Sequence, residues 1–396
     1  MDLDAFHWLL TDPGRRLLTE AEALVAEGSS ALQVGEQLRR RYDAERVAVA
    51  LTQLELRVRA VAKFGDRAAA MYFTPDGLEQ ATRLPVATHR AGRMAAAGPA
   101  SVIDLGCGIG GDLIAFSRAG ITSAGIDLDP VRVAVAQANL DALGLAGAVR
   151  VGDATTLDTA MFDIAFADPA RRTGAGRSFD VEAWLPPWSF VERLLSGGIR
   201  LGACVKVAPG IPHSLVPAGV EAEWVSDHGE VKEATLWSGA LATTRRRATV
   251  IGDGGLATLT KDDDPGAGVR EVGRFLYEPD GAVIRAGLVT AVAAVVGGGL
   301  LDPRIAYVTS DESPRTPFAR RYQVLEQLPY REKQLKAALR ERGIGAVTIK
   351  KRGVDVVPDQ LRKRLSLTGE QAATLVLTRA QDGSRGRGVA LLVEPC

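Results

Sequence analysis

The chain has 396 residues, of which 46% are hydrophobic and 24% charged, so it can bury a core and form two or three domains. Its 48 basic residues balance its 48 acidic residues, and the net charge therefore neither requires nor excludes a nucleic-acid partner. Cys107, Cys204 and Cys396 lie far apart without a paired spacing, which argues against a disulfide framework and a zinc site. We predict no bound metal.

The start of the chain and its apolar stretches bear on localisation. The sequence MDLDAFHWLLTDPGRR is acidic before a short apolar run and lacks the basic and long apolar regions of a secretion signal. The most membrane-like stretch, near residues 287–301, falls short of the ~20 apolar residues that a membrane span requires. We predict a cytoplasmic protein without membrane contact, and the sequence leaves its oligomeric state open.

Residues 1–94 are predicted to form an N-terminal helical region that packs on the domain after it. Between residues 43 and 64, apolar residues recur every three or four positions, which is the stripe of an amphipathic helix. The predicted stripe consists of Val47, Leu51, Leu54, Val58 and Val61.

Residues 95–245 are predicted to form a Rossmann-like α/β domain. Short β-branched runs alternate there with helical stretches, a pattern typical of a parallel sheet with crossover helices. Two later segments, EAEWVSD and KEATLWSGAL, predict strands joined through His228 and Gly229 that close the sheet. The other expected strands are 102–105, 122–126, 148–151, 162–167 and 203–207, and the expected helices are 112–119, 130–143 and 181–195.

The remaining chain is predicted to hold a linker subdomain, residues 246–316, and a second α/β unit, residues 317–396. The second unit contains a charged helix, the strand AVTIKKRG, a basic helix near residues 361–365 and two more strands. From Arg320 onward sixteen basic residues stand against eight acidic ones, so basic charge is concentrated at this end of the chain.

The segment VIDLGCGIGGD, residues 102–112, predicts a strand, a glycine-rich turn and the start of a helix. Gly106, Gly108 and Gly110 lack a Cβ atom, so the backbone can turn tightly and approach a ligand near the helix N-terminus. With Gly111 the segment also satisfies the dinucleotide pattern G-x-G-x-x-G, and an acidic residue follows at the required distance. A dinucleotide site is therefore an alternative.

Three carboxylates favour S-adenosyl-L-methionine as the cofactor. Asp104 precedes the glycines, where it can hold an ammonium group and would repel a pyrophosphate. Asp127 ends the second strand, where it can accept both ribose hydroxyls, and Asp153 follows the third strand, where it can receive the adenine amino group. The spacing of all three matches the class I methyltransferase pattern, although each aspartate by itself could be a helix cap.

The segments VIDLGCGIGGDLIAFSRAG and GIDLDPVRVAVAQANLDALGL resemble the cofactor-binding half of the RNA cap guanine-N2 methyltransferase (trimethylguanosine synthase) family. Upstream, MYFTPDGLEQAT looks like the family's segment that leads into the domain and closes over the cofactor. The resemblance covers about residues 72–168. The C-terminal unit resembles the THUMP-like domain found behind such methyltransferases in bacteria, and THUMP domains bind RNA, so the resemblance implies an RNA partner.

The family's motif after the fourth strand is only partly present in this chain. Asp168 and Pro169 match it, but Ala170 replaces the second proline and Arg171 stands in place of the stacking aromatic residue. This departure places cap specificity in doubt. A later LPPW resembles the missing motif, but we interpret it as a packing element within the following helical region.

Methyl transfer is an in-line displacement, so the enzyme mainly has to position the nucleophile and the cofactor. Asp168 and the backbone after Pro169 are predicted to accept hydrogen bonds from an amino nucleophile; the alternative for Asp168 is a loop cap. Arg171 and Arg172 are predicted to grip phosphate at the carboxyl edge of the sheet, unless they are solvated or ion-paired.

The basic cluster Lys350, Lys351 and Arg352 is predicted to add sequence-independent RNA affinity, although it could equally be a solvated face. We therefore predict a methyltransferase that N-methylates a base in tRNA or rRNA. The alternatives are a small-molecule or protein methyltransferase, and an RNA-binding protein that holds the cofactor without catalysis.

Overall fold

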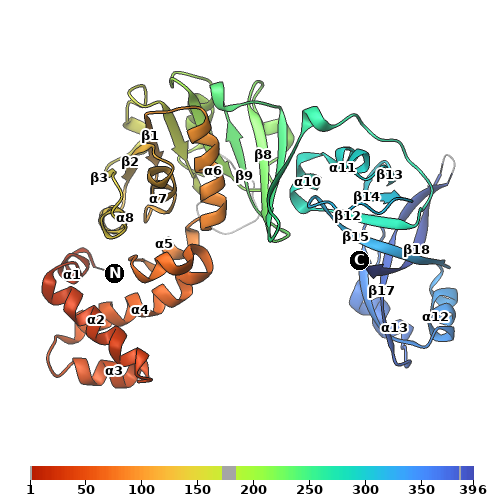
Figure 1. Cartoon of the computed structure of the whole chain (residues 1–396), viewed down its shortest axis with the longest axis horizontal. Coiled ribbons are helices and arrows are strands. Elements are labelled where there is room, and N and C mark those ends of the chain that lie inside the picture. Colours follow the sequence, from red (N-terminus) through yellow and green to blue (C-terminus); the bar gives the residue numbers. More distant parts are fainter. Residues whose placement is uncertain (1, 172–183, 383–384) are drawn as a thin grey trace. The chain divides into compact units, whose positions relative to one another are not determined.

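The computed structural model describes residues 2–171, 184–382 and 385–396. The chain divides into two compact units, the first made of Met1–Val220 and Thr235–Thr243 and the second of Glu221–Ala234 and Thr244–Cys396. Figure 1 labels the elements of both units.

The predicted N-terminal helical region is present in the first unit (Figure 1). Side-chain caps fix several helix starts: Thr11 caps the second helix, and Ser30 forms a capping box with Gln33 at the third. The helices are α1 (Leu3–Leu9), α2 (Asp12–Ala26), α3 (Ala31–Leu38), α4 (Ala44–Phe64), α5 (Pro75–Gln80) and α6 (Leu84–Ala96), with a 3-10 turn at Gly65–Ala69.

Helix α4 packs only part of the predicted stripe on the core, with Leu51 and Leu54 partly buried against it. Val47 is buried as expected, but Val58 and Val61 are 75% and 55% exposed. The buried face instead continues through alanines, Gln53, Leu56 and Phe64. The prediction was therefore wrong only in the C-terminal half of the helix, where it favoured Val58 and Val61 over a face of small residues.

The predicted Rossmann-like α/β fold is confirmed in the first unit. Its parallel strands have the order β3-β2-β1-β4-β7, and the end of β9 follows β7. The strands are β1 (Ser101–Leu105), β2 (Thr122–Asp127), β3 (Ala148–Val151), β4 (Ile164–Ala167), β7 (Gly202–Val207) and β9 (Glu230–Trp237), and the helices between them are α7 (Gly111–Arg118), α8 (Pro130–Ala142) and α9 (Trp188–Leu195).

Leu185, Pro186 and Pro187 of the LPPW segment precede helix α9, whereas the sequence had suggested that the whole segment lies within a helix. A short strand β5 (Ala170–Arg171) pairs with β6 (Trp184–Leu185), and the helix begins only at Trp188. Proline cannot donate the backbone hydrogen bond that a helix interior requires, which explains the later start. Trp188 is buried and its ring meets that of Trp184 edge-on at 5.8 Å, so the segment has packing contacts.

Two buried amides hold the extended segment that joins the N-terminal helices to the sheet domain. Asn139 of α8 accepts a hydrogen bond from the Tyr72 backbone N–H at 2.6 Å and donates to the carbonyls of Tyr72 and Ile109. Gln53 of α4 makes the equivalent pair of bonds with the backbone of Phe73. Both amides are fully buried, so these bonds replace the strand neighbour that this segment lacks.

The second unit contains further strands of the nine-stranded sheet and a seven-stranded sheet of its own. From the start of β9 the first sheet continues with β8 (Glu221–Asp227), β10 (Arg246–Gly252) and β11 (Gly255–Thr260). The seven-stranded sheet has the order β13-β14-β12-β15-β18-β17-β16. Its strands are β12 (Phe275–Pro279), β13 (Gly299–Asp302), β14 (Ile305–Ser310), β15 (Ala319–Leu328), β16 (Ile344–Lys351), β17 (Gln371–Asp382) and β18 (Arg385–Pro395).

Helices cover these sheets in the second unit. Helix α10 (Gly281–Ala286) packs on β8 and β10, and α11 (Val289–Val295) packs on β13 and β14. Helices α12 (Glu332–Glu341) and α13 (Pro358–Leu365) bury leucines against β16, β17 and β18. Within the described ranges, further short 3-10 turns are Ala154–Thr156, His213–Leu215, Gly239–Leu241 and Lys261–Asp263.

Residues 246–316, predicted as a linker subdomain, are divided between the two sheets. Strands β10 and β11 extend the first sheet, whereas β12, β13 and β14 belong to the sheet that also holds β15 to β18. The sequence did not reveal this because β12 pairs with β15, a strand more than forty residues later. Within the described residues, no helix is long and apolar enough to cross a membrane.

We expect Asn139→Ala to lower the free energy of unfolding by about 2 to 4 kcal/mol, because it leaves the buried backbone groups of Tyr72 and Ile109 without partners. Urea unfolding followed by circular dichroism measures this. Gln137→Ala on the same helix is the control: Gln137 bonds Asp141 at an exposed position and should contribute less than about 0.5 kcal/mol. Equal losses in the two variants would contradict the role of Asn139.

Candidate active site

The candidate site lies at the carboxyl edge of the parallel sheet in the first unit. The register of β1 with β2 and β4, and of β4 with β7, brings four positions to the same level where the strands end. In order across the sheet they are Asp127, Gly106, Asp168 and Lys206. Neighbouring strands are ~4.8 Å apart, so the row extends over roughly 15 Å.

The glycine turn after β1 adopts a backbone that favours glycine. Gly106, Gly108 and Gly110 have φ angles of 101°, 53° and 82°. A Cβ atom on Gly106 or Gly108 would meet no atom within 4 Å, so these two glycines border open space, whereas at Gly110 it would lie 3.2 Å from Ala136. The turn therefore leaves room for a ligand beside its backbone.

Asp127 is oriented toward this turn. One carboxylate oxygen accepts the Gly108 N–H at 2.9 Å and the other accepts the Asp129 N–H at 3.0 Å. The next residue, Leu128, is 66% exposed, although it is a large apolar side chain. Leu128 was not predicted as a site residue; the sequence signal that could have indicated it is an apolar residue directly after the carboxylate at a strand end.

Asp104 is a buried carboxyl group with an unsatisfied oxygen. It is 2% exposed, and its Oδ1 atom has no hydrogen-bond partner. Burial raises the pKa of Asp104 well above its usual value, and the charges of Asp112, Asp168 and Asp127 add to the rise while Arg90 opposes it. Such a carboxyl would gain from a cationic ligand.

Asp153 follows β3, as predicted, but is exposed. Its Oδ1 atom accepts hydrogen bonds from the Thr155 side chain and backbone, at 2.7 and 2.8 Å, and these bonds lower the pKa of Asp153. These contacts are those of a turn cap. They leave its proposed adenine contact as a prediction.

Asp168 lies on the row, partly exposed, and Pro169 after it is buried. The Asp168 carboxylate accepts a hydrogen bond from Lys206 Nζ at 2.6 Å. Lys206 was not predicted as a site residue, and neither were Thr82 and Asp112, which continue the series of hydrogen bonds from it. Lys206 could have been found by aligning the ends of the fourth and fifth strands.

The predicted substrate-binding residues fall in two places. Arg171 is in strand β5, with its side chain outside the described part of the structure, and Arg172 lies outside the described residues altogether. In the second unit Lys350 is half-buried and pairs with Glu278 at 2.7 Å; burial opposes its charge, but bonds to Glu278 and Tyr322 raise the pKa of Lys350. The predicted cluster is therefore partly neutralised.

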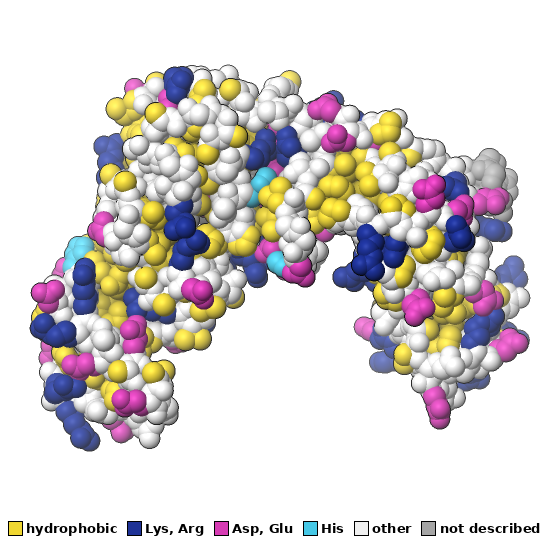
Figure 2. All heavy atoms as spheres, in the orientation of Figure 1, with side chains coloured by type: hydrophobic (Ala, Val, Ile, Leu, Met, Phe, Trp, Pro, Cys, Tyr) yellow, Lys and Arg dark blue, Asp and Glu magenta, His cyan; other side chains and the backbone are white. Residues whose placement is uncertain are grey.

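The other two members of that cluster differ. Lys351 is exposed at the end of β16, and the Arg352 guanidinium lies 5.4 Å from the centre of the Tyr307 ring. Figure 2 shows basic side chains of the second unit interspersed with acidic ones.

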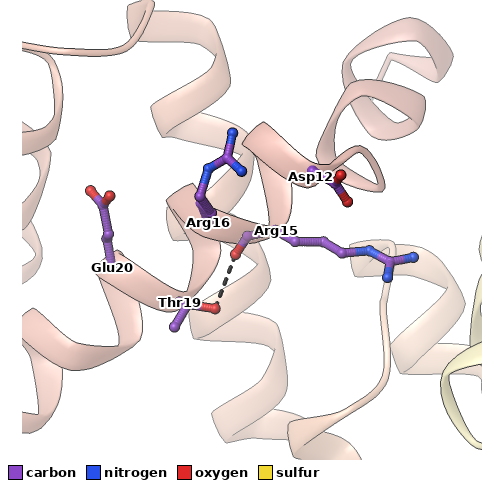
Figure 3. Close-up of a pocket in the computed structure, with 5 residues that line it drawn as sticks. All are labelled: Asp12, Arg15, Arg16, Thr19 and Glu20. Atoms are coloured by element: carbon purple, nitrogen blue, oxygen red, sulfur yellow. Dashed lines mark hydrogen bonds between the residues drawn. The ribbon is translucent and has the colours of Figure 1, made fainter.

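A surface depression of about 380 Å³ lies on α2, and none of the predicted site residues lines it (Figure 3). Asp12, Arg15, Arg16, Thr19 and Glu20 line it, and Thr19 bonds the Arg15 carbonyl. Charges of both signs from one exposed helix give it no convergent chemistry. Among the described residues, no group of His, Cys, Asp and Glu is arranged to hold a metal ion.

Comparison with known proteins identifies the family. An uncharacterized S-adenosylmethionine-dependent methyltransferase of Mycobacterium tuberculosis is 38% identical over 353 residues, which cover 86% of this chain and 95% of that protein, and the same match occurs in a second strain. The chain is a member of the S-adenosylmethionine-dependent methyltransferases. The predicted enzyme class and cofactor are confirmed.

Family models agree with this assignment for parts of the methyltransferase. Residues 102–171 match a methyltransferase domain, residues 319–395 match a THUMP domain-like model, and residues 2–60 match a domain of unknown function. The crystal structure of a putative methyltransferase from Porphyromonas gingivalis W83 shares the fold, with a TM-score of 0.74 and 21% identity over 96% of this chain and 98% of that one.

The site residues fit S-adenosylmethionine. Around the glycine turn the carboxylates of Asp112, Asp127 and Asp168 outnumber the cations Arg90 and Lys206, and Asp104 adds a fourth carboxyl group whose ionised form a cationic ligand would favour. This excess complements a ligand with a sulfonium and an ammonium group and would repel a pyrophosphate. The unsatisfied oxygen of Asp104 and the open space beside Gly106 and Gly108 agree with such a ligand.

We expect Asp104→Asn to stabilise the cofactor-free methyltransferase by about 1 kcal/mol or more at neutral pH while abolishing cofactor binding. Because its pKa is raised in the folded state, folded Asp104 holds a proton that the unfolded chain has released, so the stability of the wild type falls as the pH rises from the ordinary aspartate range toward neutrality. The variant has no carboxyl group at this position, so it should not lose stability with rising pH for this reason.

Thermal unfolding between pH 5 and pH 8 and isothermal titration with the cofactor measure the two effects. Asp141→Ala, at an exposed aspartate of α8, is the control for both. A variant less stable than the wild type throughout this range would contradict the assignment of Asp104 as a buried, unsatisfied carboxyl.

Proposed function

We propose that this methyltransferase transfers a methyl group to a nitrogen atom of a base in RNA, either tRNA or rRNA. The observation that carries the proposal is the THUMP domain-like match at residues 319–395, on the same chain as a methyltransferase core. THUMP domains bind RNA. The concentration of basic residues after Arg320 supports the same substrate, since RNA affinity has a large phosphate component.

In the cofactor half of the site we propose roles for three carboxylates. Asp104 receives the ammonium group, Asp127 the ribose hydroxyls and Asp153 the adenine amino group. The glycine turn at residues 106–110 lets the backbone approach the ligand, and its contact with Asp127 keeps that carboxylate beside the turn. When bound, S-adenosylmethionine supplies the electrophilic methyl group.

In the acceptor half we propose that Asp168 and the backbone after Pro169 accept hydrogen bonds from the amino nucleophile and align its lone pair with the methyl group. An amino group attached to a base needs little help with its proton, because the proton is lost readily once the nitrogen carries the methyl group. Arg171 and Arg172 are proposed to hold a phosphate near this edge, and Lys350, Lys351 and Arg352 to add contacts to the RNA backbone.

The test is transfer of tritium from labelled S-adenosylmethionine into total RNA from a strain that lacks the protein. We expect the wild type to label RNA, and Asp168→Ala and Asp127→Ala to lower the rate at least ~100-fold, through loss of nucleophile alignment and of cofactor binding respectively. Digestion of the RNA to nucleosides with mass spectrometry then identifies the methylated base.

Asp141→Ala is the surface control in this assay and should keep wild-type activity. Label in the protein or small-molecule fraction instead of RNA would overturn the RNA assignment. Unchanged transfer by Asp168→Ala would show that another group aligns the nucleophile.

The basic cluster predicts a separate effect on substrate binding. We expect the double variant Lys351→Glu, Arg352→Glu to raise KM for RNA about tenfold and to reduce the salt dependence of binding, with unchanged affinity for the cofactor. The charge reversal Arg15→Glu on the exposed face of α2 is the control. An equal effect of Arg15→Glu would mean that RNA senses only the net charge of the chain.

A further inference from the structure

Lys206, which the sequence analysis did not single out, lies at the acceptor end of the site. It is the next-to-last residue of β7 and stands opposite Asp168 in the register of β4 and β7. Its Nζ atom donates to Asp168 Oδ2 at 2.6 Å, and its side chain is only 17% exposed. Solvent screens such a sheltered pair less than a surface pair, so the pair can fix the orientation of the carboxylate.

A buried threonine orients the lysine in turn. Lys206 Nζ lies 3.1 Å from Thr82 Oγ1, which lies 3.2 Å from Asp112 Oδ2. An ammonium group can only donate, so the hydroxyl accepts from Lys206 and donates its own proton to Asp112. The direction of every hydrogen bond in this chain is therefore determined.

This series of hydrogen bonds ends at Arg90, a cation in the protein core. Asp112 forms an ion pair with Arg90, which is 1% exposed. The Arg90 guanidinium also lies 4.7 Å from the centre of the Phe166 ring, and Phe166 belongs to β4, the strand that leads into Asp168. The hydrogen bonds thus connect Asp168 to the buried Arg90, which contacts the strand that precedes Asp168.

Lys206 also changes the charge that the site presents to a ligand. The four acidic residues around the glycine turn, Asp104 among them, have only two cations beside them. These two cations are Lys206 and Arg90. Removing the charge of Lys206 would make the site more negative.

We propose that Lys206 is a positioning residue: with Thr82 it fixes the Asp168 carboxylate toward the nucleophile, and it moderates the negative charge that faces the cofactor. The first part rests on the proposed role of Asp168, but it does not require that the acceptor be RNA. The second part, the effect of Lys206 on the charge that faces the cofactor, concerns cofactor binding alone and does not depend on the acceptor.

The transfer rate tests the first part in whichever fraction, RNA, protein or small molecule, accepts the label. We expect Lys206→Met, which keeps the length of the side chain but not its charge, to lower kcat at least ~10-fold with less than ~2-fold change in KM for the acceptor. Lys206→Arg should recover at least half of the activity. Thr82→Val should lower kcat about 3-fold, and Thr82→Ser, which keeps the hydroxyl, should recover it.

Calorimetric titration with S-adenosylmethionine and with S-adenosylhomocysteine tests the second part. S-adenosylmethionine carries a sulfonium charge and S-adenosylhomocysteine does not. We therefore expect Lys206→Met to raise the ratio of the affinity for S-adenosylmethionine to that for S-adenosylhomocysteine by a factor of about 3 or more over the wild type. This ratio of affinities can be measured even if RNA is not the substrate, so the two proposals can fail independently.

A purely structural role would give a different result. If Lys206→Met lowered the thermal stability and weakened both ligands equally, with no rescue by Lys206→Arg, the inference would be overturned. Unchanged kcat in the labelled fraction would overturn the positioning role, and an unchanged affinity ratio would overturn the role in charge balance.

Discussion

The parallel pairing of β2, β1, β4 and β7 is the constraint on which the site depends. Residues separated by up to a hundred positions in the sequence form one row because their strands run in the same direction and end at the same level. A slip of one residue in β4 or β7 would turn each side chain to the opposite face and separate Asp168 from Lys206. The site therefore requires that the register be fixed elsewhere.

The opposite edge of the sheet contains such a fixing contact. Asp163, just before β4, accepts the backbone N–H groups of Ala100 and Ser101 at the start of β1, at 2.6 and 3.2 Å. It also pairs with Arg200, just before β7, and this hydrogen bond holds the pKa of Asp163 well below its usual value. One carboxylate thus aligns the amino ends of three adjacent strands, and the alignment of their carboxyl ends follows.

The sequence predicted the parts of the site that depend on local chemistry. The glycine turn with Asp104 and Asp127 has a fixed spacing along the chain, and the structure brings these residues together as the pattern implied. Lys206 and Thr82 were missed because nothing near them in the sequence indicates their partner; only the strand register and the end of α5 bring them to Asp168 and Asp112. The same reason explains why residues 246–316 were not assigned to their sheets.

Residues 320–396 contain more basic than acidic residues, and several of these basic residues form ion pairs within the same region. Arg342 pairs with Glu326, Arg364 with Glu332 and Arg362 with Asp359. Each pair removes one charge of each sign, so pairing within residues 320–396 leaves the excess unchanged. Lys350 and Arg379 pair instead with acidic residues outside this region, Glu278 and Asp302, and these two pairs reduce the excess. The remaining positive charge is distributed over side chains of several helices and strands, an arrangement that suits the extended phosphate backbone of a nucleic acid more than a single small anion.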